Sequence, residues 1–579
     1  MGQNTITASW RTKPHDEAAS AELAKELGLS PLVGQLLWNR DFFTREEATR
    51  FLRPTLDHLI DPERLDGIPE AVARISKALS RDEKILIYGD YDVDGMTSAA
   101  LLYHFFKLVN ARVDVFLPRR IEEGYGLNAG LFKRFQKEGV GLIVTVDCGI
   151  TAIDEALAAR EMGIDLVITD HHEPEARTPE AAAVINPKKH GSSYPYKYLA
   201  GVGVAFKLAW ALAKHFSGEK TVQPEFREFL LNALGLVALG TVADVVPLTG
   251  ENRVFVSMGL DALLNSRLPG VRALMNIAGV RDSLSARDVA FRLAPRLNAA
   301  GRMNEPESGL ELLVTESFGR AVEIARDLDA KNKARQAIEK KILSAARKLL
   351  LKSCDPSKLR TILLAGKDWH PGVLGIVASR IAEEFYRPTL LLNIEGELAR
   401  GSARSIPSFH FFDALRSCQE HLVAYGGHAQ AAGVTVATDA IDSLRDALEG
   451  VAAKVLSSDE MTPSMRIDAE VPLGDVTARL VRELAMLEPY GEGNPPPLLL
   501  ARNLEAVGRH RRIGSDGQHL SFFVRSNSRG VRAVAFRMGH LASKLSAHDG
   551  VLSLLFEPQI DTWRGTGEAE LIVRDIRFE

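Results

Sequence analysis

Between residues 84 and 170, short and nearly continuous apolar runs alternate with stretches of helical character. The runs are Ile85–Tyr88, Val113–Leu117, Leu142–Val146 and Leu166–Thr169. Strands that are apolar on both faces are typical of a parallel sheet that helices cover on its two sides. Their alternation with helices therefore predicts an α/β fold with a parallel sheet for this part of the chain.

The pattern changes several times along the 579 residues, which is enough chain for three or four domains. Near the start, Thr44 and Glu47 have the spacing of a capping box, and Pro54 ends the helix that they begin. A long charged stretch without proline predicts a connecting helix, although a surface helix of one domain is the alternative. The predicted parts are a helical N-terminal segment (1–55), an α/β domain (56–315), a connecting helix (316–355), a smaller α/β domain (356–457) and a β-barrel domain (458–579).

Composition limits the functions that are compatible with this chain. With 71 Lys and Arg against 75 Asp and Glu, its net charge of −4 excludes a generally basic nucleic-acid binder but not a local basic groove. Its three cysteines, Cys148, Cys354 and Cys418, are far apart, which argues against a disulfide framework and against a CxxC zinc site. The start lacks the features of a signal peptide, and no apolar run approaches about 20 residues, so we expect a cytoplasmic protein.

Acidic and imidazole side chains stand where three of the predicted strands end. They are Asp90, Asp92 and Asp94 after the first strand, Asp147 after the third, and Asp170, His171 and His172 after the fourth, with Asp244 further along the chain. Because parallel strands end at one edge of a sheet, we expect these groups to converge there. Clustered carboxylates repel one another unless cations neutralise them, so the pattern predicts bound divalent metal. Mostly oxygen ligands with one or two imidazoles suit Mn²⁺ first and Mg²⁺ second, and the lack of thiolate ligands disfavours zinc.

Each of these residues also has an ordinary structural interpretation. The Asp-x-Asp-x-Asp-Gly run from Asp90 could open an EF-hand loop, but Leu101 occupies the twelfth position, where that loop needs a bidentate Glu. Any single aspartate could cap the helix that follows it. Adjacent histidines are usually a solvated surface pair, but His171 and His172 directly follow an apolar strand and an aspartate. A metal site explains the whole set better than these separate interpretations do.

Two motifs resemble those of a known superfamily. Asp170-His171-His172, together with the run 90–95 and Asp147, resembles the DHH phosphoesterases, and Gly-Gly-His-Ala-Gln-Ala-Ala-Gly at 426–433 resembles the motif of their companion DHHA1 domain. Within the superfamily, the chain is most similar to the RecJ family of single-stranded-DNA-specific exonucleases. Further matching segments, in the right order along the chain, are 296–302, 401–405, 488–495 and the β-rich tail. The resemblance covers nearly the whole chain.

The resemblance implies roles for the residues at matching positions. Asp147 would bridge two ions, Asp90 and Asp170 would orient their neighbours, and His172 would lie near the scissile phosphate as a donor or an additional ligand. Many relatives have a His where this chain has Tyr88, so the first metal would have one protein ligand fewer. The implied metal ligands are Asp92, Asp94, Asp147, His171 and Asp244. The residues expected on phosphates or DNA are Arg296, Asn298, Arg302, Ser402, Arg404 and His428, and Ser402 and Arg404 would help to recognise the 5′ end.

The tail resembles the OB-fold of the same family. It carries a basic cluster at 509–512 and aromatic residues on strand-like runs, which are Phe522, Phe523, Phe536 and Trp563. A basic groove with stacking aromatics is what sequence-independent binding of single strands requires. At least half of these aromatics are expected in the core of the barrel instead, and the sequence does not distinguish the two sets.

The resemblance implies a metal-dependent exonuclease that uses two Mn²⁺ (or Mg²⁺) ions. It would hydrolyse single-stranded DNA from 5′ to 3′ to mononucleotides in DNA repair and recombination, and its implied partners are a single-strand-binding protein and a RecQ-type helicase. One alternative is another DHH phosphodiesterase that acts on short oligonucleotides or cyclic dinucleotides, or a pyrophosphatase, which the β-rich tail disfavours. Another is a non-catalytic single-strand-binding scaffold, which should have lost ligand acids that this chain retains.

Overall fold

The computed structural model describes residues 8–119, 123–124, 126–218, 221–353, 355–527, 529–562 and 564–579, so Cys354 and Trp563 lie outside the described residues. The chain divides into two compact units. One comprises 11–298, 306–325 and 466–579, and the other comprises 8–10, 299–305 and 326–465. The predicted fold class, with a parallel α/β sheet, a second α/β sheet and a terminal β-barrel, is confirmed.

The larger unit contains a five-stranded, all-parallel sheet with the order β3-β2-β4-β5-β6. Its strands are β2 (Lys84–Gly89), β3 (Val113–Phe116), β4 (Val140–Val146), β5 (Asp165–Thr169) and β6 (Ala183–Ile185). The first four coincide with the predicted apolar runs, whereas β6 has only three residues and was not predicted. Because β2, β4 and β5 are immediate neighbours, the strands that end in acids lie side by side.

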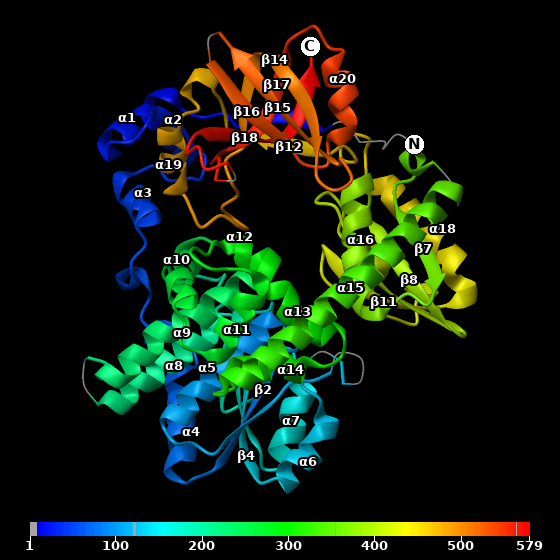
Figure 1. Ribbon diagram of the computed structural model, residues 1–579. Helices are drawn as coiled ribbons and strands as arrows, with labels where there is room; N and C mark the ends of the chain where they lie inside the picture. The colour runs from blue at the N-terminus through cyan, green and yellow to red at the C-terminus, as the bar shows by residue number, and fades with distance from the viewer. Residues whose placement is uncertain are drawn as a thin grey trace. The chain divides into compact units, whose positions relative to one another are not determined.

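Helices cover both faces of this sheet, as the apolar runs require. Helices α6 (Phe132–Lys137) and α7 (Ile153–Glu161) pack on one face, where side chains such as Tyr88 and Ile143 form a core. Helices α4 (Ile68–Ser80), α5 (Val93–Leu108) and α8 (Gly201–Ser217) pack on the other face (Figure 1). A further helical layer consists of α9 (Pro224–Ala243), α10 (Gly250–Leu264), α11 (Pro269–Ala278), α12 (Ala286–Asp288), α13 (Ala294–Arg302) and α14 (Pro306–Val314).

Helix α9 is long and apolar enough to cross a membrane by length and composition, and it is the only helix of this kind in the described part of the chain. Of its most apolar window, 67% is buried inside the protein. That burial is typical of a core helix, and α9 packs against α5, α8 and α10.

The same unit contains the N-terminal helices and the C-terminal barrel. Helices α1 (Glu17–Leu27), α2 (Pro31–Trp38) and α3 (Arg45–Leu52) share an apolar core with α19 (Ala478–Ala485). The capping box of Thr44 and Glu47 at the start of α3 is confirmed. Pairing of β14 with β17 closes the barrel, whose strands are β14 (Leu499–Ile513), β15 (His519–Ser526), β16 (Arg529–Ala535), β17 (Leu552–Ile560) and β18 (Ala569–Phe578).

The smaller unit is built on a mixed sheet with the order β10-β11-β9-β8-β7. Its strands are β7 (Ile362–Lys367), β8 (Thr389–Glu395), β9 (Leu398–Arg404), β10 (Ala424–Gly427) and β11 (Ala431–Ala437). One face packs on α16 (Pro371–Phe385) and on the last part of α15 (Phe318–Ser353), and the other face packs on α17 (Phe411–Ser417) and α18 (Ile441–Val455). The 36-residue helix α15 begins in the larger unit and ends in the smaller one.

Candidate metal centre

The loop after β2 turns sharply so that its acids face the sheet edge. Asp92 caps α5, and its Oδ1 accepts hydrogen bonds from the backbone N–H groups of Asp94 (2.9 Å) and Gly95 (3.1 Å). A Cβ at Gly95 would lie 2.4 Å from the carbonyl oxygen of Asp90, so only glycine fits there. The two hydrogen bonds to Asp92 confirm that it caps the helix, but capping occupies only one of its two carboxylate oxygens.

Asp94 lies on the first turn of α5, and its side chain contacts the N-terminus of α8. Its Oδ2 accepts a hydrogen bond from the backbone N–H of Gly201 (2.6 Å), and its Oδ1 accepts one from that of Val202 (2.9 Å). Burial, followed by the charge of Asp92, raises the pKa of Asp94 to about 7. Without a cation, this carboxylate is therefore under strong pressure to take up a proton.

Asp147 follows β4 and is buried in the middle of the cluster. Its backbone is left-handed (φ 60°), and so is that of Val245 (φ 62°), next to Asp244. Such conformations cost about 1–3 kcal/mol for residues other than glycine and concentrate at functional sites. Burial and the charges of Asp94 and Asp92 hold the pKa of Asp147 well above its usual range.

Asp170 orients the residues around it rather than facing the centre of the cluster. Its carboxylate accepts hydrogen bonds from the backbone N–H groups of Ile150 (2.9 Å) and His171 (2.7 Å), and it pairs with Nδ1 of His172 (2.7 Å). Burial would raise the pKa of Asp170, but its contact with His172, the charge of His171 and the hydrogen bond from Ile150 together lower it. The same contact raises the pKa of His172 against the effect of burial, which favours a protonated imidazole.

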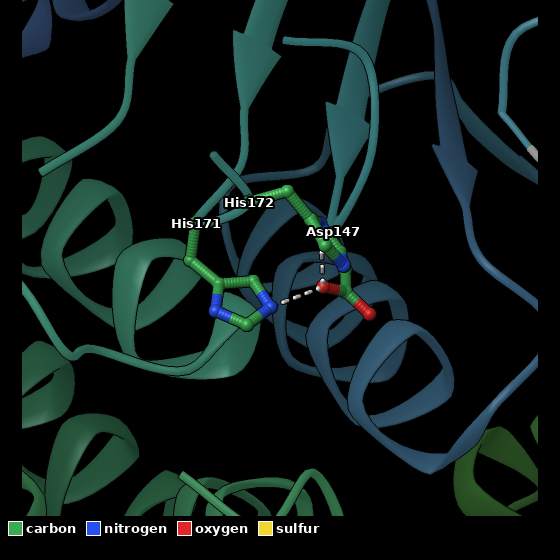
Figure 2. A group of neighbouring side chains, drawn as sticks. All are labelled: Asp147, His171 and His172. Carbon is green, nitrogen blue, oxygen red and sulfur yellow. Dashed lines mark ion pairs between the residues drawn. The ribbon is translucent and has the colours of Figure 1, made fainter. Parts of the chain in front are cut away.

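His171 brings the acids of three segments together. Its Nε2 lies 3.1 Å from Asp147 Oδ1, the pair drawn in Figure 2. It also lies 3.5 Å from Asp244 Oδ2 and 3.9 Å from Asp94 Oδ2. Burial, and then the charge of His172, lowers the pKa of His171 to about 3, so the ring is neutral and offers a lone pair. Asp244 follows the last residue of α9, and burial and the charge of Asp94 raise its pKa well above the usual range.

The donor set fits a divalent cation. Among the described residues, Asp147 Oδ1, His171 Nε2 and Asp244 Oδ2 are buried and have no hydrogen-bond partner, although the imidazole nitrogen lies within 3.5 Å of both oxygens. Atoms of this kind are costly to bury unless a ligand satisfies them. Three groups have ligand atoms within 4.8 Å of one another, and Asp147 belongs to two of them. The groups are Asp147–His171–His172, Asp94–His171–Asp244 and Asp90–Asp92–Asp147.

The structure divides the predicted phosphate-binding residues between the two units. In the larger unit, Asn298 Oδ1 accepts a hydrogen bond from the backbone N–H of Val93 (3.3 Å), directly after Asp92, and Arg296 donates to the carbonyl oxygen of Arg292. Asn298 is thus placed beside the metal centre, in a structural contact that the sequence did not reveal.

The smaller unit contains the other phosphate-binding candidates, on β9, in the hairpin before β11 and next to the start of α16. On β9, Arg404 Nη1 donates to Ser402 Oγ (2.8 Å), and a Cβ at Gly375 of α16 would lie 2.7 Å from Arg404 Nη2. His428 is exposed in the hairpin between β10 and β11, and β11 pairs with β9 so that Ala431 faces Arg404. Arg302 donates to the carbonyl oxygen of Gly372 (3.2 Å) at the start of α16.

Sequence reasoning missed several residues that shape the centre. A Cβ at Gly201 would lie 2.7 Å from Asp147 Oδ1, and one at Gly240 would lie 2.9 Å from Asp94 Oδ1. Asn186, at the end of β6, is fully buried and donates to the carbonyl oxygen of His172 (2.9 Å). Tyr88 supplies no ligand, because its hydroxyl donates to the carbonyl oxygen of Gly126 and its ring packs in the core on α6 and α7. The glycines at 201 and 240 were the only sign in the sequence of these close approaches to the acids.

Comparison with known proteins agrees with this arrangement. Residues 84–241 match the DHH family, N-terminal domain; 357–454 match the DHHA1 domain; and 467–575 match the RecJ OB domain. The chain is 37% identical to the single-stranded-DNA-specific exonuclease RecJ of Bacillus subtilis over 98% of its own length and 70% of that protein. It is 32% identical to RecJ of Escherichia coli, over 96% of its own length and 97% of the relative. The chain belongs to the RecJ family.

Solved RecJ structures extend the agreement to the fold and the metal. A crystal structure of RecJ from Thermus thermophilus in complex with Mn²⁺ matches with a TM-score of 0.83 and 33% identity, over 98% of this chain and 79% of that one. The structure of the same protein with Mg²⁺ matches with a TM-score of 0.78. This RecJ-family chain is therefore an exonuclease of the DHH phosphoesterase type that depends on Mn²⁺ or Mg²⁺, as the sequence predicted.

Proposed function

We propose that the protein degrades single-stranded DNA from its 5′ end and releases mononucleotides, with Asp92, Asp94, Asp147, His171 and Asp244 as the ligands of two divalent ions. The main support is the convergence of buried donor atoms from Asp147, His171 and Asp244, which lack hydrogen bonds among the described residues. Asp147 and His171 each belong to two of the three ligand groups. Asp147 is the shared ligand in this proposal, because a carboxylate has two oxygens whereas His171 offers a single nitrogen.

The chain's own residues hold and orient the reacting groups in this proposal. When bound, the two ions supply the Lewis acidity that phosphodiester hydrolysis needs. Asp170 fixes the ring of His172, whose raised pKa suits a protonated donor to a phosphate oxygen. Asp90 is buried at the start of the loop, and its proposed role is to orient its neighbours. Asn298 contacts that loop, and Arg296 lies two residues before it on α13.

The smaller unit supplies the proposed recognition of the 5′ end. Ser402 and Arg404 are hydrogen bonded to each other, and the lack of a side chain at Gly375 lets both pack closely against α16. A guanidinium with an adjacent hydroxyl suits a terminal phosphate. Arg302 and His428 are further phosphate contacts in this proposal, and they lie in the same unit.

The barrel is proposed to bind the strand without reading its sequence. Phe523 and Phe536 are exposed, and so are Arg509, Arg511 and Arg512. Exposed aromatics together with positive charge are the combination that single-strand binding uses. We also propose, from the family alone, that the protein works in the cytoplasm with a single-strand-binding protein and a RecQ-type helicase, which co-purification of the tagged protein with either partner would test.

The test uses purified protein with Mn²⁺ and three substrates: a single strand labelled at its 5′ end, the same strand labelled at its 3′ end, and a blunt duplex. We expect immediate release of a labelled mononucleotide from the first, gradual shortening of the second and no cleavage of the third. The variant Asp147→Asn should lose more than about 99% of the activity while it remains folded. Asp165→Asn is the matched control, because Asp165 lies at the opposite end of β5 and pairs with Arg74 (2.6 Å). Cleavage from the 3′ end, or of dinucleotides only, would contradict the proposal.

A further inference from the structure

A fourth strand end lies at the edge of the sheet that carries the acids. Strand β6 runs parallel to β5, with Ile185 paired to Thr169, and the backbone N–H of Asp170 donates to the carbonyl oxygen of Ile185 (3.0 Å). The residues after β6 therefore lie next to Asp170, His171 and His172. They include Lys188, to which the proposed mechanism assigns no role.

Asn186 fixes the chain between β6 and Lys188. Its side chain is fully buried, and Nδ2 donates to the carbonyl oxygen of His172 (2.9 Å). Its Oδ1 accepts a hydrogen bond from the backbone N–H of Lys188 (2.7 Å). One amide thus ties the backbone of Lys188 to the backbone of His172, and the lysine starts from a defined position beside the metal centre.

The ammonium group of Lys188 is close to the metal centre but is weakly held. Nζ lies 3.0 Å from Oε1 of Glu173, and the side chains are 22% and 68% exposed, respectively. An ion pair with such an exposed partner contributes little and exchanges easily. Burial is the main reason that the pKa of Asp244 is raised, and the charge of Lys188 opposes that rise. The same charge adds to the effects of burial and of His172 that lower the pKa of His171.

The net negative charge of the site explains why a positively charged side chain is needed next to it. Six carboxylates lie in the centre or next to it, those of Asp90, Asp92, Asp94, Asp147 and Asp244 and, behind His172, that of Asp170. Two divalent ions would cancel four of these six charges and a protonated His172 would cancel a fifth, so the site is still negative when an anionic phosphodiester approaches. Positive side chains must offset the remainder if the phosphate is to bind and its charge is to increase during hydrolysis.

We propose that Lys188 is a catalytic residue that leaves Glu173 and binds a non-bridging oxygen of the scissile phosphate. This inference rests on the proposed function, because it assigns a further residue to the same site. A flexible ammonium group on a fixed backbone suits this role, since it can follow the phosphate as charge develops. Lys188 thus lowers the barrier of the reaction without being a metal ligand.

The test compares Lys188→Met, Lys188→Arg and Lys189→Met with the wild type on single-stranded DNA at saturating Mn²⁺. Lys189 is the matched control, because it is the next residue in the chain but lines a different cavity with Glu63, Asp66 and Glu70. We expect kcat/KM to fall by about a hundredfold in Lys188→Met, to recover largely in Lys188→Arg and to be unchanged in Lys189→Met.

The affinity for Mn²⁺, measured by titration calorimetry without DNA, distinguishes this role from a structural one. Lys188→Met should bind Mn²⁺ at least as tightly as the wild type does, because it removes a positive charge near the ligands. Slower hydrolysis with weaker Mn²⁺ binding would show that the site is distorted and would overturn the inference. Activity of Lys188→Met within twofold of wild type, or equal losses in the Met and Arg variants, would overturn it as well. Failure of the proposed function is distinguishable, because the wild type itself would then not cleave the strand.

Discussion

The backbone N–H of Gly201 donates a hydrogen bond of 2.6 Å to Asp94, although the two residues are 107 positions apart in the chain. The same glycine lies against Asp147, because a Cβ at position 201 would be 2.7 Å from its Oδ1. Gly201 therefore holds one carboxylate directly and makes room for a second. The N-terminus of α8 also brings the positive end of a helix dipole to the acids.

Gly201→Ala should reduce exonuclease activity by about two orders of magnitude, because its methyl group would displace Asp147 or Asp94 by a large fraction of an ångström. The affinity for Mn²⁺ should fall in parallel. Gly203→Ala is the control, since a Cβ there would meet Leu199 at an ordinary 3.4 Å. Steady-state kinetics and metal titration of both variants check this prediction, and unchanged activity in Gly201→Ala would contradict it.

Without metal, the acids should make stability depend on pH. Burial, then the charge of Asp92, raises the pKa of Asp94 from its ordinary 3.8 to about 7, so the folded protein binds a proton more tightly than the unfolded chain does. The contribution of Asp94 to the free energy of unfolding is fully present below about pH 4 and is lost as the pH rises through about 7. For this residue alone, the loss is on the order of 4 kcal/mol.

Mn²⁺ binds the deprotonated carboxylates, so the increase in Tm that it causes should grow between pH 5 and pH 8. Thermal unfolding in EDTA and in Mn²⁺ across this range measures the difference. The variant Asp94→Asn should show a flatter dependence of Tm on pH in EDTA. A metal-induced shift in Tm that is constant with pH would argue against a carboxylate centre.

Arg253 should stabilise the larger unit by joining its N-terminal helices to the segment before the barrel. Its buried guanidinium donates to the carbonyl oxygens of Phe51 (2.7 Å), Leu487 (3.0 Å) and Glu488 (2.7 Å). Arg253→Met leaves these carbonyl groups unsatisfied and should lower the free energy of unfolding by about 3 kcal/mol. Arg267→Met, at a side chain that is 87% exposed, should change it by less than about 0.5 kcal/mol. Urea denaturation of both variants provides the measurement.

Two neighbouring phenylalanines of β15 should have different roles. Phe523 is 40% exposed and Phe522 is 1% exposed, because successive residues of a strand face opposite sides of the sheet. Phe523→Ala should weaken binding of an oligonucleotide by about 1–3 kcal/mol with little effect on stability. Phe522→Ala should instead lower the free energy of unfolding by about 3–5 kcal/mol. Fluorescence anisotropy in EDTA, which prevents cleavage, and thermal unfolding separate the two effects.

Much of the fold was predictable because local patterns carry it. Continuous apolar runs specify buried parallel strands, and the spacing of Thr44 and Glu47 specifies the start of a helix. Strand β6 was missed because three residues, Ala183–Ile185, are too short to show a pattern. The aromatics of the tail could not be assigned from the sequence either, since the alternation of Phe522 and Phe523 places one inside and one outside only when the register is known.

By itself, the sequence determined the chemistry of the protein: which acids and imidazoles follow which strands, and hence that the chain binds metal and belongs among the DHH phosphoesterases. Tertiary structure alone decided how these groups meet. The strand order places β2, β4 and β5 side by side, α9 brings Asp244, and the N-terminus of α8 brings two backbone N–H groups to Asp94. The physical reason is that apolar burial sets the arrangement of strands and helices over the whole chain, whereas backbone donors and close approaches at glycine leave no distinctive side chain in the sequence.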